Sequence, residues 1–594
     1  MLLKTTAQNF PQKTAIFSKQ NGRYFPQSWF DFNKEVDAAA SALLEQGAAV
    51  GDRLAILSEN RPEWALTDMA AQSIGLVTVP IYPSLTPKEI EYILHDSQAS
   101  WIAVSNHTLF QKILPIVKSL PALRGVLVFD STLSLFQKEI HLPMLLIREI
   151  KKNPIQSDRL RSRFSQIRSD AVASIIYTSG TTGEPKGVML THDNFMHNVL
   201  ASRKALQMGE GDVHLSFLPL SHVFERMAGY YLMIFLGATI AYAENMDTVP
   251  QDLLEVKPTF ILGVPRFYEK IKSRVLEVVE KSSHSRRAIF LWARAVGGEK
   301  RRRLEQGGSL PSGLKLRLGL ANLLVYKKFR QRLGGRVRFC ISGSAPLAKE
   351  IAEFFCDLGV MIYEGYGLTE TSPVISANRE GRCRFGTVGI PLEGVQVKIA
   401  GDGEIVTKSA SVMKGYYGKP AETQEAIDKE GWFHTGDLGQ FDREGFLQIT
   451  GRKKELIVTS GGKKVSPRPI EEMLENDPYI LRCVLFGEGK KYLTALLVPN
   501  KEKLLEYASD QKIAATSYSD LLKDAKIYQF LDSRVTALTE NLASFEKIKY
   551  FIVLENDFSQ AAGELTPTLK VKREVVLAKY HHLLLPLYEK EKTS

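Results

Sequence analysis

Short apolar runs alternate with longer helical stretches over the first two thirds of the chain. Three early runs have the length of β-strands and lie at residues 54–57, 76–79 and 101–104. The stretches between them begin near Pro62 and Pro87, and proline suits a first helical turn because the N–H that it lacks would have no partner there. This alternation predicts β-α-β units, in which helices join parallel strands.

The same alternation resumes after Asp170. We therefore expect two α/β subdomains with parallel sheets, over residues 1–169 and 170–385. The longest uncharged run, residues 227–243, falls just short of a membrane-spanning helix and contains two glycines, so it predicts a buried helix followed by a core strand. The further strand-length runs lie at residues 173–177, 239–242, 260–262 and 337–341.

The pattern changes from about residue 386. Short segments separated by glycine-rich turns predict a small β subdomain over residues 386–450. Mixed helical and strand patterns return beyond Gly451 and predict a compact, mobile α+β C-terminal domain over residues 451–594. The fold class that we expect is α/β, with two parallel-sheet subdomains and the small β subdomain ahead of the C-terminal domain.

Composition and charge narrow the possible classes of protein. With 594 residues, 44% of them hydrophobic and 24% charged, the chain has several globular domains and is neither disordered nor fibrous. Its net charge of +11 favours anionic partners such as nucleic acid, CoA phosphates or phospholipid surfaces, without choosing among them. Basic residues cluster at 159–168 and 300–303, and a solvated charged face is the ordinary interpretation of each.

Cysteine usage and the N-terminal residues indicate the cellular setting. The four cysteines show no C-x-x-C spacing, which argues against a structural zinc site and a disulfide framework. The first residues lack the apolar run of a signal peptide. We expect a cytoplasmic protein, with contact to the inner face of a membrane as an open alternative.

The most informative stretch is Tyr-Thr-Ser-Gly-Thr-Thr-Gly-Glu-Pro-Lys-Gly at residues 177–187. Its glycines let backbone N–H groups face an anion, and its hydroxyls and Lys186 supply further donors to phosphate oxygens. It is not a P-loop, because no hydroxyl follows the lysine to hold magnesium. The stretch predicts a loop that binds the phosphates of ATP, with a flexible surface turn as the alternative.

Further segments occur in an order that resembles the adenylate-forming superfamily over nearly the whole chain. Val264-Pro265-Arg266 and residues 364–372 look most like the long-chain fatty acyl-CoA synthetases within it. The segments that carry the resemblance are Leu-Pro-Leu-Ser-His at 218–222, Ser-Gly-Ser-Ala-Pro at 342–346, Tyr-Glu-Gly-Tyr-Gly-Leu-Thr-Glu at 363–370, Trp-Phe-His-Thr-Gly-Asp at 432–437, Gly-Arg-Lys-Lys-Glu at 451–455 and Thr-Pro-Thr-Leu-Lys at 566–570.

The resemblance implies a two-step reaction with ATP, Mg²⁺ and CoA. A long-chain fatty acid attacks the α-phosphate of ATP to give acyl-AMP and pyrophosphate, and CoA then takes the acyl group. An acyl-carrier protein as the acceptor is the alternative, since it needs the same adenylation residues and an acidic carrier suits a basic surface. Luciferase-type oxidation stays open, because it begins with the same adenylate. The presence of Glu370, Asp437 and Lys570 argues against a non-enzymatic fatty-acid binder, and the absence of a nucleic-acid-binding motif argues against a nucleic-acid binder.

Each implied role falls on a numbered residue. Glu370 would hold Mg²⁺, Thr369 would bind the α-phosphate, and Lys570 would neutralise charge between the carboxylate and that phosphate. His222 would position or gate the acyl group. Outside the motifs, the commoner interpretations are a helix cap for Thr369, a turn for Asp437 and solvated charge for Lys570.

The same resemblance assigns the nucleotide site, the hinge and the CoA channel. Lys454 would be the hinge of the C-terminal domain, and Gly461 and Gly462 would lie along the pantetheine channel. The expected ATP and AMP contacts are Thr178, Ser179, Gly180, Thr181, Thr182, Gly183, Lys186, Gly343, Ser344, Ala345, Glu364, Gly365, Tyr366, Gly367, Asp437 and Arg452.

Two regions bear on the acyl substrate. The apolar run at residues 229–242 suits an acyl slot, although core packing is its ordinary explanation. A long basic helical segment between Arg266 and Gly343 resembles an insertion typical of long-chain members. Its apolar residues 288–293 would allow membrane contact, with a plain surface helix as the alternative.

Overall fold

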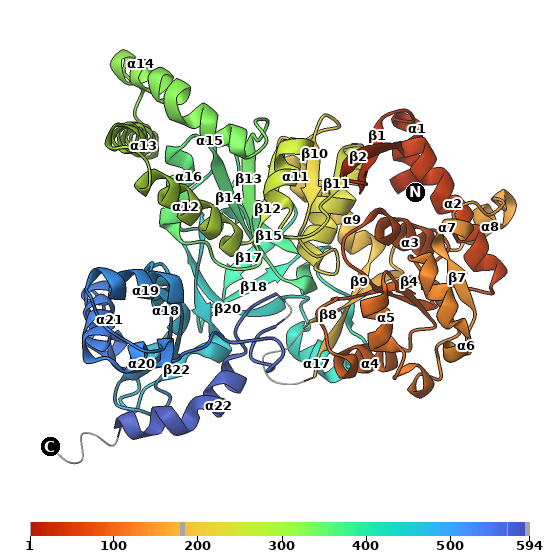
Figure 1. Ribbon diagram of the computed structural model, residues 1–594. Coiled ribbons are helices and arrows are strands. Elements are labelled where there is room, and N and C mark those ends of the chain that lie inside the picture. The colour runs from red at the N-terminus through yellow and green to blue at the C-terminus, as the bar shows by residue number, and fades with distance from the viewer. Residues whose placement is uncertain (1, 179–183, 567, 589–594) are drawn as a thin grey trace.

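The computed structural model describes residues 2–178, 184–566 and 568–588. Two large sheets and a small antiparallel sheet make up the larger part of the molecule, and a separate C-terminal part lies against one side of it (Figure 1). The fold class predicted from the sequence is confirmed in these elements.

The eight-stranded sheet contains the first three predicted strands. Its central strands run parallel, and helices α3 (Pro62–Ser73) and α4 (Pro87–Asp96) begin at the two prolines that predicted them. In spatial order its strands are β19 (Gly415–Tyr416), β9 (Lys186–Thr191), β8 (Val172–Thr178), β4 (Val77–Ile81), β3 (Arg53–Leu57), β5 (Trp101–Val104), β6 (Gly125–Val128) and β7 (Met144–Leu146).

The nine-stranded sheet has a parallel centre and antiparallel edges. Its strands β10 to β14 pair in parallel, whereas β15, β16 and β2 pair antiparallel with their neighbours. In spatial order the strands are β16 (Ile390–Pro391), β15 (Val374–Ala377), β14 (Met361–Gly367), β13 (Phe339–Ser342), β12 (Phe260–Gly263), β10 (Val213–Ser216), β11 (Thr239–Tyr242), β1 (Thr14–Gln20) and β2 (Arg23–Ser28).

Strands of the two sheets interleave along the chain, across the boundary expected between residues 169 and 170. The N-terminal strands β1 and β2 join the nine-stranded sheet, and β8 and β9 join the eight-stranded one. Apolar runs predict strands but not their partners, so a linear boundary does not describe the two sheets.

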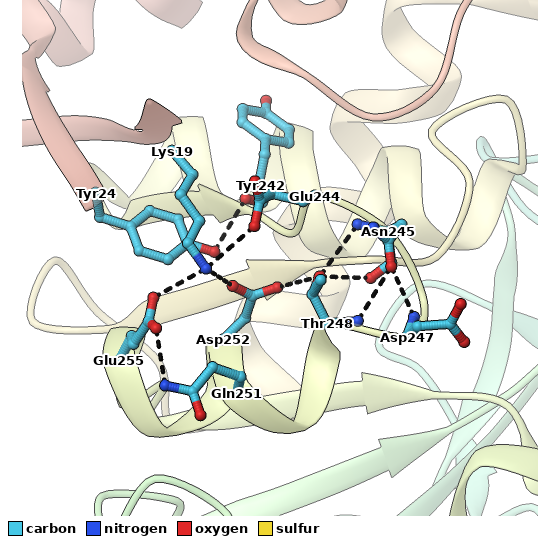
Figure 2. Close-up of polar contacts among 10 residues, drawn as sticks. All are labelled: Lys19, Tyr24, Tyr242, Glu244, Asn245, Asp247, Thr248, Gln251, Asp252 and Glu255. Carbon is cyan, nitrogen blue, oxygen red and sulfur yellow. Dashed lines mark hydrogen bonds and ion pairs between the residues drawn. The ribbon is translucent and has the colours of Figure 1, made fainter. Parts of the chain in front are cut away.

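A buried lysine on β1 links the N-terminal strands to helix α11 (Val249–Val256). The side chain of Lys19 is only 6% exposed, and its Nζ lies 2.8 Å from Asp252 Oδ1 and 3.0 Å from Glu255 Oε2 on this helix. A third carboxylate, that of Glu244, lies 3.2 Å away (Figure 2). Buried Asp252 also accepts a hydrogen bond from Thr248, so each buried charge has partners.

The uncharged run at residues 227–243 folds as predicted. It lies in a π-helix (Glu225–Tyr231), helix α10 (Leu232–Leu236) and strand β11, and its side chains are largely buried in the main core. The basic segment after Arg266 is helical, also as predicted. Its helices are α12 (Pro265–Glu280), α13 (His284–Glu305), α14 (Ser312–Ala321), a π-helix (Asn322–Tyr326) and α15 (Lys327–Arg332). Among the described residues, no helix is both long enough and apolar enough to cross a bilayer.

The remaining strands form three small sheets. The expected β subdomain is a four-stranded antiparallel sheet of β17 (Gln396–Ile399), β18 (Glu404–Lys408), β20 (Phe433–Phe441) and β21 (Leu447–Arg452). The C-terminal part has a hairpin of β22 (Ile457–Val458) and β23 (Lys464–Val465), and a sheet of β24 (Ile480–Phe486), β25 (Leu493–Pro499) and β26 (Ile548–Val553). Its helices include α18 (Pro467–Glu475), α19 (Lys501–Asp510), α21 (Ala525–Leu538) and α22 (Arg573–Leu584).

Candidate active site

The expected phosphate loop connects two adjacent antiparallel strands. Strand β8 ends at Thr178 and β9 begins at Lys186, and these two residues face each other in the sheet. Both ends of the loop are therefore fixed side by side, at the same end of two neighbouring strands of the eight-stranded sheet. The predicted contacts Ser179, Gly180, Thr181, Thr182 and Gly183 lie outside the described residues.

Lys186 and Glu370 are brought together by a tyrosine that the motifs did not single out. The hydroxyl of Tyr416, on edge strand β19, donates a 3.0 Å hydrogen bond to Glu370 Oε1. The ammonium of Lys186 lies 5.0 Å from the centroid of the same ring. Thr369 and Glu370 lie in a short 3₁₀ turn that follows β14. Because Lys186 and Glu370 both contact Tyr416, the end of the phosphate loop lies near the predicted metal ligand.

Glu370 fits the role of a magnesium ligand. Burial raises the pKa of its carboxyl group, and the hydrogen bond from Tyr416 opposes that rise. Tyr416 is the one side chain in the described part of the chain that is hydrogen-bonded to this carboxylate, and no ion pair occupies it there. A carboxylate oxygen is a suitable ligand for a hard cation. The described residues hold no group of three or more His, Cys, Asp or Glu placed to bind a metal by themselves.

Asp437 is the centre of a second polar group. Its Oδ2 accepts a 2.8 Å hydrogen bond from the hydroxyl of Tyr366, and its Oδ1 lies 3.3 Å from Nε of Arg452. The expected turn at Asp437 is wrong, because this residue lies within strand β20, directly opposite Arg452 on β21. The preceding Gly436 has a φ of +71°. The strand is therefore locally irregular at this glycine, and such a position has a sequence that resembles a turn.

Lys570 reaches this group from the C-terminal part. Its loop is closed by a hydrogen bond from Thr566 N–H to the carbonyl of Lys570 at 2.8 Å and by one from Lys570 N–H to the Thr566 hydroxyl at 3.0 Å. The residue keeps accessible surface, and its ammonium interacts electrostatically with Arg452 and Asp437 of the larger part. Loss of surrounding water and the positive charge of Arg452 lower the pKa of its ammonium to about 8, while Asp437 acts in the opposite direction.

His222 is close enough to Lys570 for the charge of the lysine to act on its ring. Desolvation and the positive charge of Lys570 lower the pKa of its imidazole to about 4, so the ring is neutral at pH 7. Its Nδ1 accepts a 3.1 Å hydrogen bond from the backbone N–H of Phe224, which places the proton of the neutral ring on Nε2. The ring is a hydrogen-bond donor there.

Two of the expected nucleotide-binding segments, at residues 343–345 and 364–367, require small residues at close approaches of the backbone. A side chain at Gly343 would bring a Cβ within 3.0 Å of the ring of Phe224, and one at Gly367 would bring a Cβ within 1.8 Å of the Pro373 carbonyl oxygen. Ser344 has a left-handed backbone with a φ of +69°. The adjoining residues Ala345 and Gly365 complete these segments.

Glu364 is the unusual member of the second segment. It lies on β14 with 6% of its surface exposed, and its Oε1 has no hydrogen-bond partner among the residues that the structure describes. Burial raises the pKa of its carboxyl group to about 8. The carboxyl is therefore substantially protonated at neutral pH and can donate a hydrogen bond.

The hinge and channel residues lie apart from these groups. Lys454 is exposed in the short turn after Arg452, and Gly461 and Gly462 occupy the exposed turn between β22 and β23. Within the described ranges, no hydrogen bond or ion pair joins that turn to Asp437 or Lys570.

Helix α18 contributes charged residues that the motifs did not predict. The guanidinium of Arg468 lies 2.8 Å from Glu472 and 3.5 Å from Glu475. Its positive charge also acts on Lys570, and the charge of Glu472 acts on Glu364 across the boundary between the two parts. Only the Arg-x-x-x-Glu spacing along a helix was a signal in the sequence, and it does not reveal what the helix faces.

Comparison with known proteins identifies the family. Residues 3–417 match the AMP-binding enzyme family, and residues 454–592 match the AMP-binding enzyme C-terminal domain. The chain belongs to the AMP-binding enzyme family. The second match begins at Lys454.

Two similar curated relatives of this AMP-binding enzyme are long-chain-fatty-acid–CoA ligases. FadD15 of Mycobacterium bovis is 35% identical over 94% of this chain and 91% of its own length. ACSBG1 of Bos taurus is 33% identical over 100% of this chain and 85% of its own length.

Solved structures share the fold. The adenylation domain of a carboxylate reductase from Mycobacterium chelonae superposes with a TM-score of 0.75 at 22% identity, over 99% of this chain and 90% of that one. ATP-bound MatB from Rhodopseudomonas palustris superposes with a TM-score of 0.67 at 24% identity, over 98% of this chain and 99% of that one.

Proposed function

We propose that this AMP-binding enzyme activates a long-chain fatty acid with ATP and transfers the acyl group to CoA. The observation that carries the proposal is the electrostatic interaction of Lys570, from the C-terminal part, with Asp437, Arg452 and His222 of the larger part, where Asp437 and Arg452 form an ion pair. The choice of a fatty acid is supported by the long-chain ligases that resemble this chain over nearly its full length.

In the first step a carboxylate oxygen attacks the α-phosphorus, and the bond from that phosphorus to the bridging oxygen of the pyrophosphate breaks. Two anions must approach each other, so catalysis depends on positive charge and in-line positioning. Lys570 would neutralise charge between the carboxylate and the α-phosphate, with Thr369 as a hydroxyl donor. Lys186 and the phosphate loop would hold the departing pyrophosphate. Mg²⁺ held by Glu370 would neutralise phosphate charge.

The nucleoside would be held by the Asp437 group. The Asp437 carboxylate suits the two ribose hydroxyls, and Arg452 keeps that carboxylate oriented by an ion pair. Tyr366 donates to the same carboxylate and offers a ring face to adenine. Protonated Glu364 would donate a hydrogen bond near the base.

His222 would position the fatty carboxylate rather than transfer a proton. A pKa near 4 makes the ring a weak base at neutral pH, and its Nε2–H is a hydrogen-bond donor. Replacement by another neutral donor would therefore preserve more activity than replacement by alanine.

In the second step a thiol attacks the acyl carbon and AMP leaves. Lys570 would have to withdraw to admit the thiol, so we propose that the C-terminal part rotates about Lys454 between the steps. Gly461 and Gly462 would then line the path of pantetheine. The acceptor would be CoA, with acyl-carrier protein as the second candidate because of the net charge of +11.

The substrate proposal is tested by carboxylate-dependent release of pyrophosphate across short to long fatty acids. Release should rise with chain length and be accompanied by AMP, and CoA should outcompete acyl-carrier protein as acceptor. If no fatty acid stimulates release, the proposed function is wrong. If acyl-carrier protein were preferred to CoA, only the proposed acceptor of the acyl group would change, and the proposed first step would stand.

The role of Lys570 is tested by measuring the two half-reactions separately. Lys570→Ala should slow formation of acyl-AMP by roughly a hundredfold or more, equivalent to about 3 kcal/mol. Transfer from added acyl-AMP to CoA should change little, since the lysine acts in the first step. A variant that forms acyl-AMP at the normal rate would contradict the assignment.

A further inference from the structure

The net positive charge of the molecule lies in the segment from helix α13 to helix α15. Residues 284–332 contain thirteen Lys and Arg side chains against two Glu, a net charge of +11. That value equals the net charge of the whole chain, and the other 545 residues hold 64 basic and 64 acidic side chains. The basic character of the protein is therefore localised in one helical segment.

The same segment exposes a row of leucines. On helix α14 and the π-helix that follows it, the exposed fractions are 70% for Leu316, 48% for Leu320, 63% for Leu323 and 41% for Leu324. Their spacing of four, three and one residues places them on one side of the helix. We call these four residues the leucine stripe.

The opposite side of the helix supplies the packing. Leu314, Ala321 and Tyr326 are buried there, and the Tyr326 hydroxyl donates a 2.6 Å hydrogen bond to the Ala293 carbonyl of helix α13. One apolar side of the helix therefore packs against the rest of the protein, and a second apolar side is exposed to solvent. Contiguous exposed apolar side chains of this kind mark interaction sites.

Lysines without ion-pair partners border the stripe. Lys315, Lys327 and Lys328 are exposed and have no salt bridge within the described part of the chain. Their aliphatic stems can lie against apolar surface while the ammonium groups reach anionic headgroups. This combination of leucines and lysines is typical of helices that lie in the interface of a membrane.

The segment is held firmly where it joins the body of the molecule. Gly297 of α13 lies so close to helix α16 (Lys349–Asp357) that an added Cβ would be 1.9 Å from the Asp357 carbonyl oxygen. Arg301 binds the Asp357 carboxylate at 3.0 Å and that of Glu353 at 2.7 Å. Figure 1 shows α14 projecting from the molecule beyond α13, at the opposite end from helix α22. The stripe is thus carried on a projecting but firmly attached helix pair.

We propose that the leucine stripe and its bordering lysines dock this enzyme on the surface of a bilayer that contains anionic phospholipid. Charge complementarity favours this partner, because the segment holds all of the net positive charge of the chain. A second copy of the chain would bring two such segments together, which like charges oppose. The inference rests on the proposed function for its purpose, since long-chain fatty acids partition into membranes.

The test is sedimentation of the full chain with vesicles, without ATP or fatty acid. Vesicles of phosphatidylcholine are compared with vesicles that contain about one third phosphatidylglycerol, at low salt and at about 0.3 M salt. The enzyme should bind the anionic vesicles preferentially, and binding should weaken as salt increases. Failure to bind anionic vesicles at low salt would overturn the proposal.

Two variants locate the surface. Leu316→Ser, Leu320→Ser and Leu323→Ser together should weaken the partition to anionic vesicles by about tenfold or more. Lys315→Gln, Lys327→Gln and Lys328→Gln together should weaken it and reduce its dependence on salt. The matched controls alter exposed residues elsewhere and should bind like the unaltered protein. These controls are Leu135→Ser, Met246→Ser and Leu505→Ser for the leucines, and Lys34→Gln, Lys88→Gln and Lys429→Gln for the lysines.

Two further results would overturn the proposal. Equal vesicle binding by the stripe variant and its control would place the docking surface elsewhere. Concentration-dependent dimerisation that the stripe variant loses would make the surface a contact between copies. Fatty-acid-dependent pyrophosphate release in the absence of vesicles tests the proposed function separately, and the stripe variant should retain it.

Discussion

At the scale of single residues, the candidate site gathers ionisable groups whose pKa values are shifted in opposite directions. The pKa of Lys570 is lowered to about 8 and that of His222 to about 4, whereas that of the Glu364 carboxyl group is raised to about 8. Each shift reduces the charge that the group carries when it is desolvated. The site can therefore receive a highly charged nucleotide, whose phosphates would restore the full charge of Lys570.

The lowered pKa of Lys570 predicts a limb in the pH profile of the first half-reaction. Only the ammonium form can neutralise the developing negative charge, so kcat/KM for ATP should fall as pH rises through about 8. Lys570→Arg should be slower at neutral pH but lose this limb, because a guanidinium stays charged. The rate of acyl-AMP formation between pH 6 and about 10 measures both. An identical limb in the arginine variant would assign the titration to another group.

The motifs predicted which residues meet at the site but not all of their neighbours. Glu370, Asp437 and Lys570 come from separate segments, and the structure gives each the charged or hydroxyl partners that a nucleotide site needs. Tyr416 was missed because it lies 46 residues from its partner Glu370, and a tyrosine near an apolar strand is ordinary in sequence. The local environment of Asp437 was misjudged because a strand irregularity at Gly436 has the composition of a turn.

At the scale of elements, the hydrophobic pattern predicted strands and helices well but could not predict their partners. The apolar runs before and after residue 170 are strands, and the prolines begin helices as expected. The exchange of β1–β2 and β8–β9 between the two large sheets depends on contacts between distant segments. The buried link from Lys19 to Asp252 spans 233 residues, and no local pattern encodes it.

Two glycines should respond differently to substitution by alanine. At Gly367 the new Cβ would collide with the Pro373 carbonyl, so Gly367→Ala should reduce the free energy of unfolding by about 1–3 kcal/mol. At Gly461 the nearest atom would be 4.0 Å away, so Gly461→Ala should leave stability unchanged.

The functional effect of the second substitution tests the proposed channel. Gly461→Ala should slow transfer to CoA by roughly tenfold or more and leave acyl-AMP formation intact, if pantetheine passes this turn. Thermal unfolding and the two half-reactions separate the effects. Normal transfer to CoA in Gly461→Ala would exclude the turn from the channel.

At the scale of the whole molecule, the proposed first step requires the C-terminal part to bring Lys570 to the nucleotide site. In the structure the charge of Lys570 interacts with that of Asp437, and the charge of Glu472 on α18 acts on Glu364. Little of this could be predicted from local sequence, because the relative placement of two parts depends on surfaces distant in the chain. The resemblance to a family with a swinging C-terminal domain supplied the hinge hypothesis.

That hypothesis predicts unequal effects of Lys454→Pro. Proline fixes φ and removes a backbone donor at the proposed hinge, so transfer to CoA should fall at least tenfold more than acyl-AMP formation. Lys454→Ala is the control, since it removes the same charge without fixing the backbone. Equal losses in both half-reactions would count against rotation at this residue.

The central claim is that a fatty carboxylate attacks the α-phosphate of ATP. The most direct measurement uses a long-chain fatty acid labelled with ¹⁸O in its carboxyl group and follows the label by mass spectrometry of the nucleotide product. The account predicts that AMP gains one labelled oxygen in each turnover, with pyrophosphate unlabelled. Label in inorganic phosphate together with ADP, or AMP formed without label, would contradict it.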